Sequence, residues 1–132
     1  MIESYVRQSI LIAENDVLTR LTVTNMLEAL GFRTIDAKTQ EIALGILEGV
    51  WFDTIIISST RDDQDGSIFA GKAKAVQPHI KTIVMSGLGH PEYIHPHVDA
   101  LVAKPFSLDD LILAVCGIPC GSTKGLKYRT FQ

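Results

Sequence analysis

The segment that most constrains the fold is residues 52–58, Phe-Asp-Thr-Ile-Ile-Ile-Ser, which leads into a polar stretch that ends at Gly66. Residues 54–57 are all β-branched, and the run is too short for a typical helix. The serine, threonine, aspartate and glutamine residues that follow are typical of a turn. The segment therefore predicts a buried β-strand that carries a polar side chain, Ser58, at its carboxyl end.

Four more apolar runs, at residues 9–13, 32–37, 80–85 and 99–103, predict further strands. Apolar residues at helical spacing predict helices between and after them. The side chains expected to face inward are Val23, Met26, Leu27 and Leu30 in the first helix, Ala43, Ile46, Leu47 and Val50 in the second, Phe69, Ala73 and Val76 in the third, and Leu108, Leu111, Ile112 and Val115 in the last.

Local signals mark where these helices begin and end. Gly31 is a natural stop for the first helix, Thr39 can cap the second, and Ser107 begins a capping-box-like start of the last. The third begins at Gly66 and ends at Gln77-Pro78, because a residue before proline avoids the helical region. Residues 90–97 leave room for a turn or two of a fourth helix, since Pro96 would break a longer one.

Five strands that alternate with helices predict an α/β fold, a doubly wound parallel sheet with helices on both faces. We expect one domain over residues 1–118 and a flexible tail over residues 119–132, which is rich in glycine, serine and cations. A net charge of −3 gives no electrostatic case for nucleic acid binding. The chain has no apolar stretch of membrane-spanning length and no signal-peptide profile, so we expect a cytoplasmic protein with no membrane contact.

The candidate site lies where the predicted strands end, because function gathers at the carboxyl ends of strands in an open α/β sheet. The residues at these ends are Glu14, Asn15 and Asp16, then Ser58, Ser86 and Lys104. Acidic, hydroxyl and lysine side chains around one crevice predict a site for a phosphoryl group and a metal ion.

At this point the sequence resembles the receiver (CheY-like) domain of bacterial two-component response regulators, over about residues 8–116. The motifs that carry the resemblance are Glu14-Asn15 after the first strand, Asp65-Gly66 with its glycine eight residues beyond Ser58, Ser86-Gly87 after the fourth strand, and Lys104-Pro105-Phe106 after the fifth. The resemblance implies a flavodoxin-like, five-stranded parallel sheet with the strand order 2-1-3-4-5.

The resemblance also implies roles for single residues. Glu14 and Asn15 fall on the two acidic positions that hold magnesium in the family, with Asp16 beside them. Ser86 matches the hydroxyl that contacts the phosphoryl group, and Lys104 matches the lysine that pairs with it. Pro105 marks the family's cis peptide.

Four features depart from the family pattern. Asn15 takes the place of one of the two acidic residues. Ser58 falls on the phosphate acceptor, which is an aspartate in the family. Leu101 takes the place of the switch aromatic three residues before the lysine. The segment from Ser86 to Lys104 is a few residues shorter than usual, so the fourth helix is truncated.

The change at the acceptor position has chemical consequences. A serine hydroxyl without a neighbouring base is a weak nucleophile, and it forms no labile acyl phosphate. Each lost carboxylate charge, at Asn15 and Ser58, removes about 8 kcal/mol of gross attraction for a divalent ion at ~4 Å and an effective dielectric constant of ~20. We therefore expect no cofactor, with magnesium weak or absent, and Lys104 paired with Glu14 or Asp16.

The leading prediction is a stand-alone, atypical receiver domain, not an enzyme, that acts through protein contact without Asp phosphorylation. A second hypothesis keeps the site regulated, by serine phosphorylation or by an anion at Lys104. A third is a small flavodoxin-like nucleotide-binding enzyme, although no glycine-rich phosphate loop follows any strand. The resemblance implies a signalling partner, a histidine kinase or a downstream effector, and leaves a homodimer open. Trp51 is expected to pack at the rim, with partner binding as the alternative.

Overall fold

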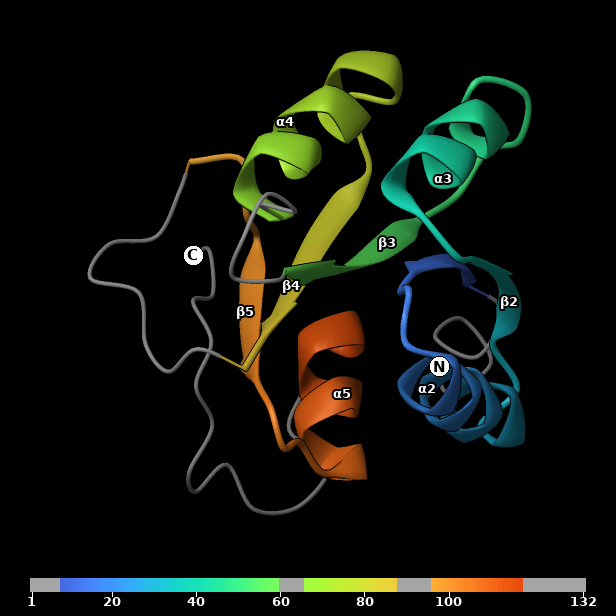
Figure 1. Ribbon diagram of the computed structural model, residues 1–132, viewed down its shortest axis with the longest axis vertical. Helices are drawn as coiled ribbons and strands as arrows, with labels where there is room; N and C mark the ends of the chain where they lie inside the picture. Colours follow the sequence, from blue (N-terminus) through green and yellow to red (C-terminus); the bar gives the residue numbers. More distant parts are fainter. Residues whose placement is uncertain (1–7, 60–65, 88–95, 118–132) are drawn as a thin grey trace.

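The predicted strands form one parallel sheet in the order β2-β1-β3-β4-β5, the order that the family resemblance implies. Figure 1 shows the computed structural model, which describes residues 8–59, 66–87 and 96–117. The strands are β1 (Ser9–Ala13), β2 (Arg33–Ala37), β3 (Thr54–Ser59), β4 (Lys81–Ser86) and β5 (Ala100–Ala103). Because β3 pairs with β1 on one side and β4 on the other, the segment that constrains the sequence most is also the centre of the sheet.

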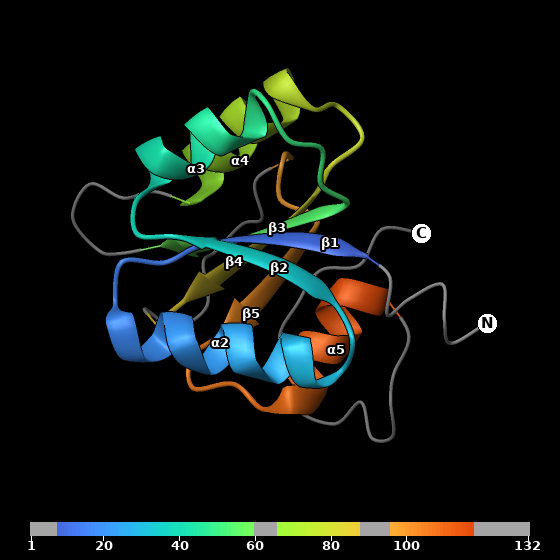
Figure 2. The same ribbon diagram turned by 90° about the vertical axis from the view of Figure 1, so that its right-hand side faces the viewer.

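Four helices cover the two faces of this sheet: α2 (Val17–Ala29), α3 (Gln40–Leu47), α4 (Gly66–Val76) and α5 (Leu108–Cys116). Figure 2 shows α3 and α4 over one face and α2 and α5 over the other. Alternate residues of a strand point to opposite faces, so Ile55 and Ile57 join the core cluster under α3 and α4, whereas Ile56 joins the cluster that α2 and α5 cover.

Side-chain caps fix the helix starts that the sequence predicts. The Thr39 side chain accepts a hydrogen bond from the Ile42 backbone N–H at the start of α3. Ser107 and Asp110 form a reciprocal capping box at the start of α5. Asp16 caps α2, so this residue of the predicted acidic stretch stabilises the start of a helix.

Three side chains that the helical pattern predicts to face inward are instead partly exposed, and those predictions are wrong. Val50 is 45% exposed, Val76 37% and Leu108 38%. Each lies at or beyond a helix end: α3 ends before Val50, α4 ends at Val76 and α5 begins at Leu108. The pattern identifies the buried face of each helix correctly, but it extends that face beyond the residues that pack against the sheet.

A buried glutamine ties the two helices of one layer to the start of β3. Gln77 Nε2 donates to the carbonyl oxygens of Leu47 at 2.8 Å and Val50 at 2.7 Å. Gln77 Oε1 accepts from the Phe52 N–H at 3.1 Å. We call this group, Gln77 with Leu47, Val50 and Phe52, the Gln77 clasp.

Beside the clasp, the rings of Trp51 and His79 stack with centroids 4.3 Å apart. Trp51 is 58% exposed, so it lies at the rim of the fold without being covered by it. Some predictions fall outside the described residues. The loop carboxylates Asp62, Asp63 and Asp65 and the tail at 119–132 lie wholly outside them, and the short helix predicted near residues 90–97 lies largely outside them. Within the described ranges, no helix has the length and apolar character needed to cross a membrane.

Candidate functional site

Three of the predicted site residues meet where β1, β3 and β5 end. Glu14 directly follows β1, Ser58 lies near the end of β3, and Lys104 directly follows β5. Lys104 Nζ donates to Glu14 Oε1 at 3.2 Å and to Ser58 Oγ at 3.1 Å. We call Glu14, Ser58 and Lys104 the Lys104 corner. Of the two partners predicted for the lysine, the structure selects Glu14.

The Glu14 carboxylate is buried, with both oxygens engaged. Its side chain has no exposed surface, whereas that of Lys104 is 27% exposed. Besides the bond from Lys104, Glu14 Oε2 accepts the Asp16 backbone N–H at 2.9 Å. Burial of an unpaired charge is costly, and here a cation and a backbone dipole offset it. Both oxygens of the Glu14 carboxylate are therefore already paired with groups of the protein.

The other two residues of the acidic stretch, Asn15 and Asp16, are exposed, and Asn15 lines the pocket beside the corner. Asp16 Oδ2 accepts from the Thr19 hydroxyl at 2.7 Å and from the Thr19 N–H at 2.8 Å. These hydrogen bonds, that from the hydroxyl foremost, lower the pKa of the Asp16 carboxyl. Thus, of the carboxylates of Glu14 and Asp16, the one that bonds to Lys104 is that of Glu14.

The fourth and fifth strands position the remaining predicted residues. The Lys104 N–H donates to the Ser86 carbonyl oxygen at 2.9 Å, which holds the end of β5 against the end of β4. The Lys104–Pro105 peptide bond is cis, as predicted. Leu101, which the resemblance matches to the family's switch aromatic, is half-buried and packs against the core cluster under α3 and α4.

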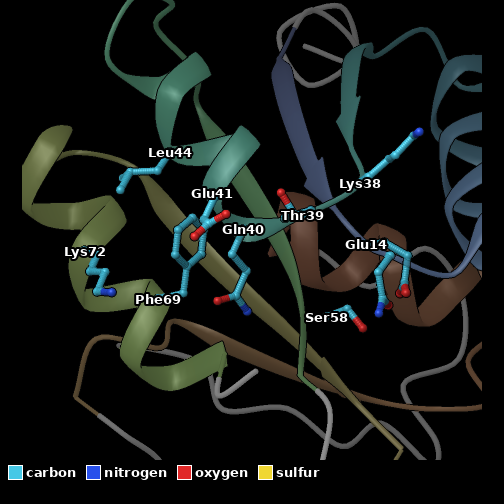
Figure 3. Close-up of a pocket in the computed structure, with 11 residues that line it drawn as sticks. Glu14, Lys38, Thr39, Gln40, Glu41, Leu44, Ser58, Phe69 and Lys72 are labelled. Carbon is cyan, nitrogen blue, oxygen red and sulfur yellow. The ribbon is translucent and has the colours of Figure 1, made fainter. Parts of the chain in front are cut away.

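A pocket of about 600 Å³ opens beside the corner, between the end of β1, the start of α3 and the first turns of α4. Figure 3 shows Glu14 and Ser58 on one side of it and Phe69 and Lys72 on the other, with the Gln40 amide between them. Its lining residues are Ala13, Glu14, Asn15, Lys38, Thr39, Gln40, Glu41, Leu44, Ser58, Phe69 and Lys72. Sequence patterns did not single out Gln40 or Lys72, because each lies on a helix whose inward stripe is defined by other residues.

Among the described residues, no three histidine, cysteine, aspartate or glutamate side chains are grouped so that they could hold a metal ion. At the Lys104 corner the potential oxygen donors are the carboxylate of Glu14 and the hydroxyl of Ser58, and both accept a hydrogen bond from Lys104. Magnesium prefers several carboxylate and water oxygens in octahedral geometry. The one carboxylate at the corner, already bonded to Lys104, differs from that ligand set.

No protein-family model matches the sequence, and no curated protein does. Solved structures do match. A CheY-like response regulator receiver domain protein from Methanospirillum hungatei JF-1 aligns with a TM-score of 0.76 at 23% identity, over 84% of this chain and 92% of that one. The receiver domain of the Francisella response regulator 1452 aligns with a TM-score of 0.72 at 25% identity, over 83% and 94%.

The Vibrio cholerae chemotaxis protein CheY4 aligns with a TM-score of 0.75 at 17% identity, over 85% of this chain and 98% of that one. Each of these matched chains is covered over nearly its whole length. The strand order and the helix layers agree with this likeness. The chain therefore has the flavodoxin-like fold of response-regulator receiver domains.

Proposed function

We propose that this chain is an atypical receiver domain that acts in signal transduction through protein contact, without forming an acyl phosphate. The observation that supports the proposal best is the hydrogen bond from Lys104 to Ser58 at 3.1 Å. A hydroxyl stands where the resemblance places the acceptor carboxylate, and the lysine that would pair with a phosphoryl group is already bonded inside the corner.

The surroundings of Ser58 support this proposal chemically. A serine becomes a nucleophile when a neighbouring base takes its proton. Lys104 Nζ donates to Ser58 Oγ and so does not accept that proton. The two histidines among the described residues lie elsewhere: the His79 ring contacts Trp51, and the His97 ring lies beside Gly71 of α4.

The proposal extends to cofactor, activity, partner and location. We expect no magnesium requirement, because one paired carboxylate is a poor ligand set for that ion. We expect no catalytic reaction of the chain's own, a histidine kinase or a downstream effector as the partner, and a cytoplasmic location. These expectations follow from the receiver fold combined with the altered acceptor position.

Intact mass measurement tests the proposal directly. The protein is incubated with acetyl phosphate and Mg²⁺ and weighed, and we expect no gain of a phosphoryl group. The matched control is the double variant Asn15→Asp with Ser58→Asp, which supplies two carboxylates at the same corner and should gain one labile phosphoryl group. A labile gain on the unaltered chain would overturn the proposal.

A second candidate function keeps the same site regulated through Ser58 itself. Its support is the position of Lys104 Nζ, which could pair with a phosphate on that hydroxyl or with a bound anion. A stable phosphoserine at residue 58 in protein purified from its native cell would favour this candidate. Its absence under several growth conditions would count against phosphorylation.

A further inference from the structure

The pocket beside the Lys104 corner contains a hydrogen-bond donor that has no partner. Gln40 Nε2 is buried and makes no hydrogen bond. Figure 3 places the Gln40 amide inside the pocket, between Phe69 and Ser58. A buried donor without an acceptor costs about 1–3 kcal/mol. An acceptor in the pocket would satisfy this donor, and because Nε2 itself is covered, the amide has to turn to present it.

Ser58 offers a second donor to the same space. Its oxygen accepts the hydrogen bond from Lys104 Nζ, which leaves the hydroxyl hydrogen available for another acceptor. Glu14, the nearest carboxylate of the pocket wall, already accepts from Lys104 and from the Asp16 N–H. Ser58 and Gln40 can thus each offer a hydrogen-bond donor to a ligand in this pocket.

The pocket lining contains a free cation that can pair with a negatively charged group. Lys72 and Lys38 form no ion pair or hydrogen bond within the described part of the chain. Figure 3 shows Lys38 turned away from Ser58, so Lys72 is the cation that can reach a bound group. Glu41 is the opposing free carboxylate, and Glu14 is neutralised by Lys104. The lining holds two lysines and two glutamates, a formal charge of zero, and the pairing of Glu14 with Lys104 leaves Glu41 as the one lining glutamate without a cation.

The remaining wall is apolar and leaves room for more than an ion. Ala13, Leu44 and Phe69 line it. A volume of about 600 Å³ lies within the range of small-molecule sites. A ligand with an apolar body as well as a charged group would fill this space better than inorganic phosphate alone.

We propose that this pocket binds a small organic anion. The oxyanion accepts hydrogen bonds from Gln40 and Ser58 and pairs with Lys72, and the apolar body lies against Leu44 and Phe69. This site lies toward α3 and α4 and, apart from Ser58, uses residues that the proposed function does not require. It would give the domain a chemical input that needs no phosphoryl transfer.

Titration with phenyl phosphate, followed by NMR chemical shifts of the full chain, tests the proposal. For a ligand of this size we expect a Kd on the order of 1 mM, with shifts centred on Gln40 and Lys72. Benzoate carries the same ring on a carboxylate, and comparing the two probes tells which oxyanion is preferred. Inorganic phosphate lacks the apolar body and should bind roughly tenfold more weakly.

Variants locate the site. Gln40→Ala and Lys72→Gln should each raise the Kd for phenyl phosphate roughly fivefold, whereas Lys72→Arg should preserve binding. Arg33→Gln is the matched control, because it removes the same charge from an exposed residue at the start of β2, the opposite end of the sheet from the pocket. It should leave the Kd unchanged.

Three results would overturn the proposal. Benzylamine, a cation with a similar ring, could bind while phenyl phosphate does not. Phenyl phosphate could bind equally well to Gln40→Ala and Lys72→Gln but not to Lys104→Met, which would confine the anion to the Lys104 corner. Third, none of the probes binds at concentrations several times the expected Kd. In that case water alone satisfies Gln40. None of these outcomes depends on whether Ser58 can be phosphorylated.

Discussion

The Lys104 corner and the Gln77 clasp lie at opposite ends of the central strand β3, and they are built in different ways. The corner joins the Lys104 side chain to two other side chains, and the lysine is 27% exposed. The clasp joins one neutral amide to three backbone groups, and Gln77 is only 7% exposed. The comparison separates polar contacts that hold the chain together from polar contacts that remain accessible to a ligand.

The difference has an energetic side. Backbone groups at the ends of α3 and at the start of β3 must be satisfied in any folded state, so a buried amide that bonds to them is a structural necessity. A lysine that bonds to a carboxylate and a hydroxyl could equally bond to an incoming group. The clasp should therefore contribute more to stability than the corner does.

Removing the clasp is expected to have the largest effect. Gln77→Ala leaves the Phe52 N–H and the carbonyl oxygens of Leu47 and Val50 without partners, and it should lower the free energy of unfolding by about 2–4 kcal/mol. Urea unfolding measures this loss. Gln40→Ala is the matched control, because the Nε2 of Gln40 has no partner to lose. Equal effects of the two substitutions would contradict the role assigned to the clasp.

Breaking the corner should cost less. Lys104→Met leaves the buried Glu14 carboxylate without its cation and should lower the free energy of unfolding by about 1–2 kcal/mol, a value reduced by the partial exposure of the lysine. Ser58→Ala keeps the ion pair and should cost less than about 1 kcal/mol. Chemical denaturation of the two variants in parallel checks the order. A greater loss for Ser58→Ala would show that the hydroxyl, not the carboxylate, anchors the corner.

The smallest effect concerns pH at the amino end of β4. Burial lowers the pKa of Lys81, and the nearby Asp99 and Cys116 oppose that shift. Between the lowered pKa and the ordinary value of 10.5, the unfolded state binds more protons than the folded state, so the lysine's contribution to stability rises with pH. Below that window both states are protonated and the contribution is constant.

The test is the difference in unfolding free energy between the unaltered chain and Lys81→Met, measured from neutral pH to pH 10.5. The unfolding free energy of the unaltered chain should increase relative to that of the variant as the pH rises. A difference that stays flat or shrinks would mean that the hydrogen bond from Lys81 Nζ to the Val115 carbonyl oxygen, at 3.1 Å, offsets the cost of burial.

Sequence patterns predict the two regions unequally. The strand over residues 9–13 has the bounds that its apolar run predicts, because buried parallel strands are continuous apolar runs. Strand ends in such a sheet converge, so the meeting of Glu14, Ser58 and Lys104 follows once the strands are placed. The choice of Glu14 over Asp16 does not follow, because it depends on Asp16 bonding to Thr19 at the start of α2.

The clasp and the pocket are harder to predict, for a physical reason. Gln77 precedes a proline, so the pattern marks it as the end of a helix and does not indicate its burial, which three backbone partners make favourable. Gln40 and Lys72 approach the same space only because α3 and α4 lie on the same face of the sheet. Such contacts depend on how elements pack in space, which periodicity along the chain does not contain.

The stack of Trp51 on His79 also gives the molecule an optical reporter. Trp51 is the only tryptophan in the chain, and it directly precedes Phe52, whose N–H belongs to the Gln77 clasp. Its emission therefore monitors the amino end of β3, at a distance from the corner and the pocket. Titrations at the carboxyl end can be followed by NMR while tryptophan fluorescence records, in the same sample, whether the far end of the strand stays intact.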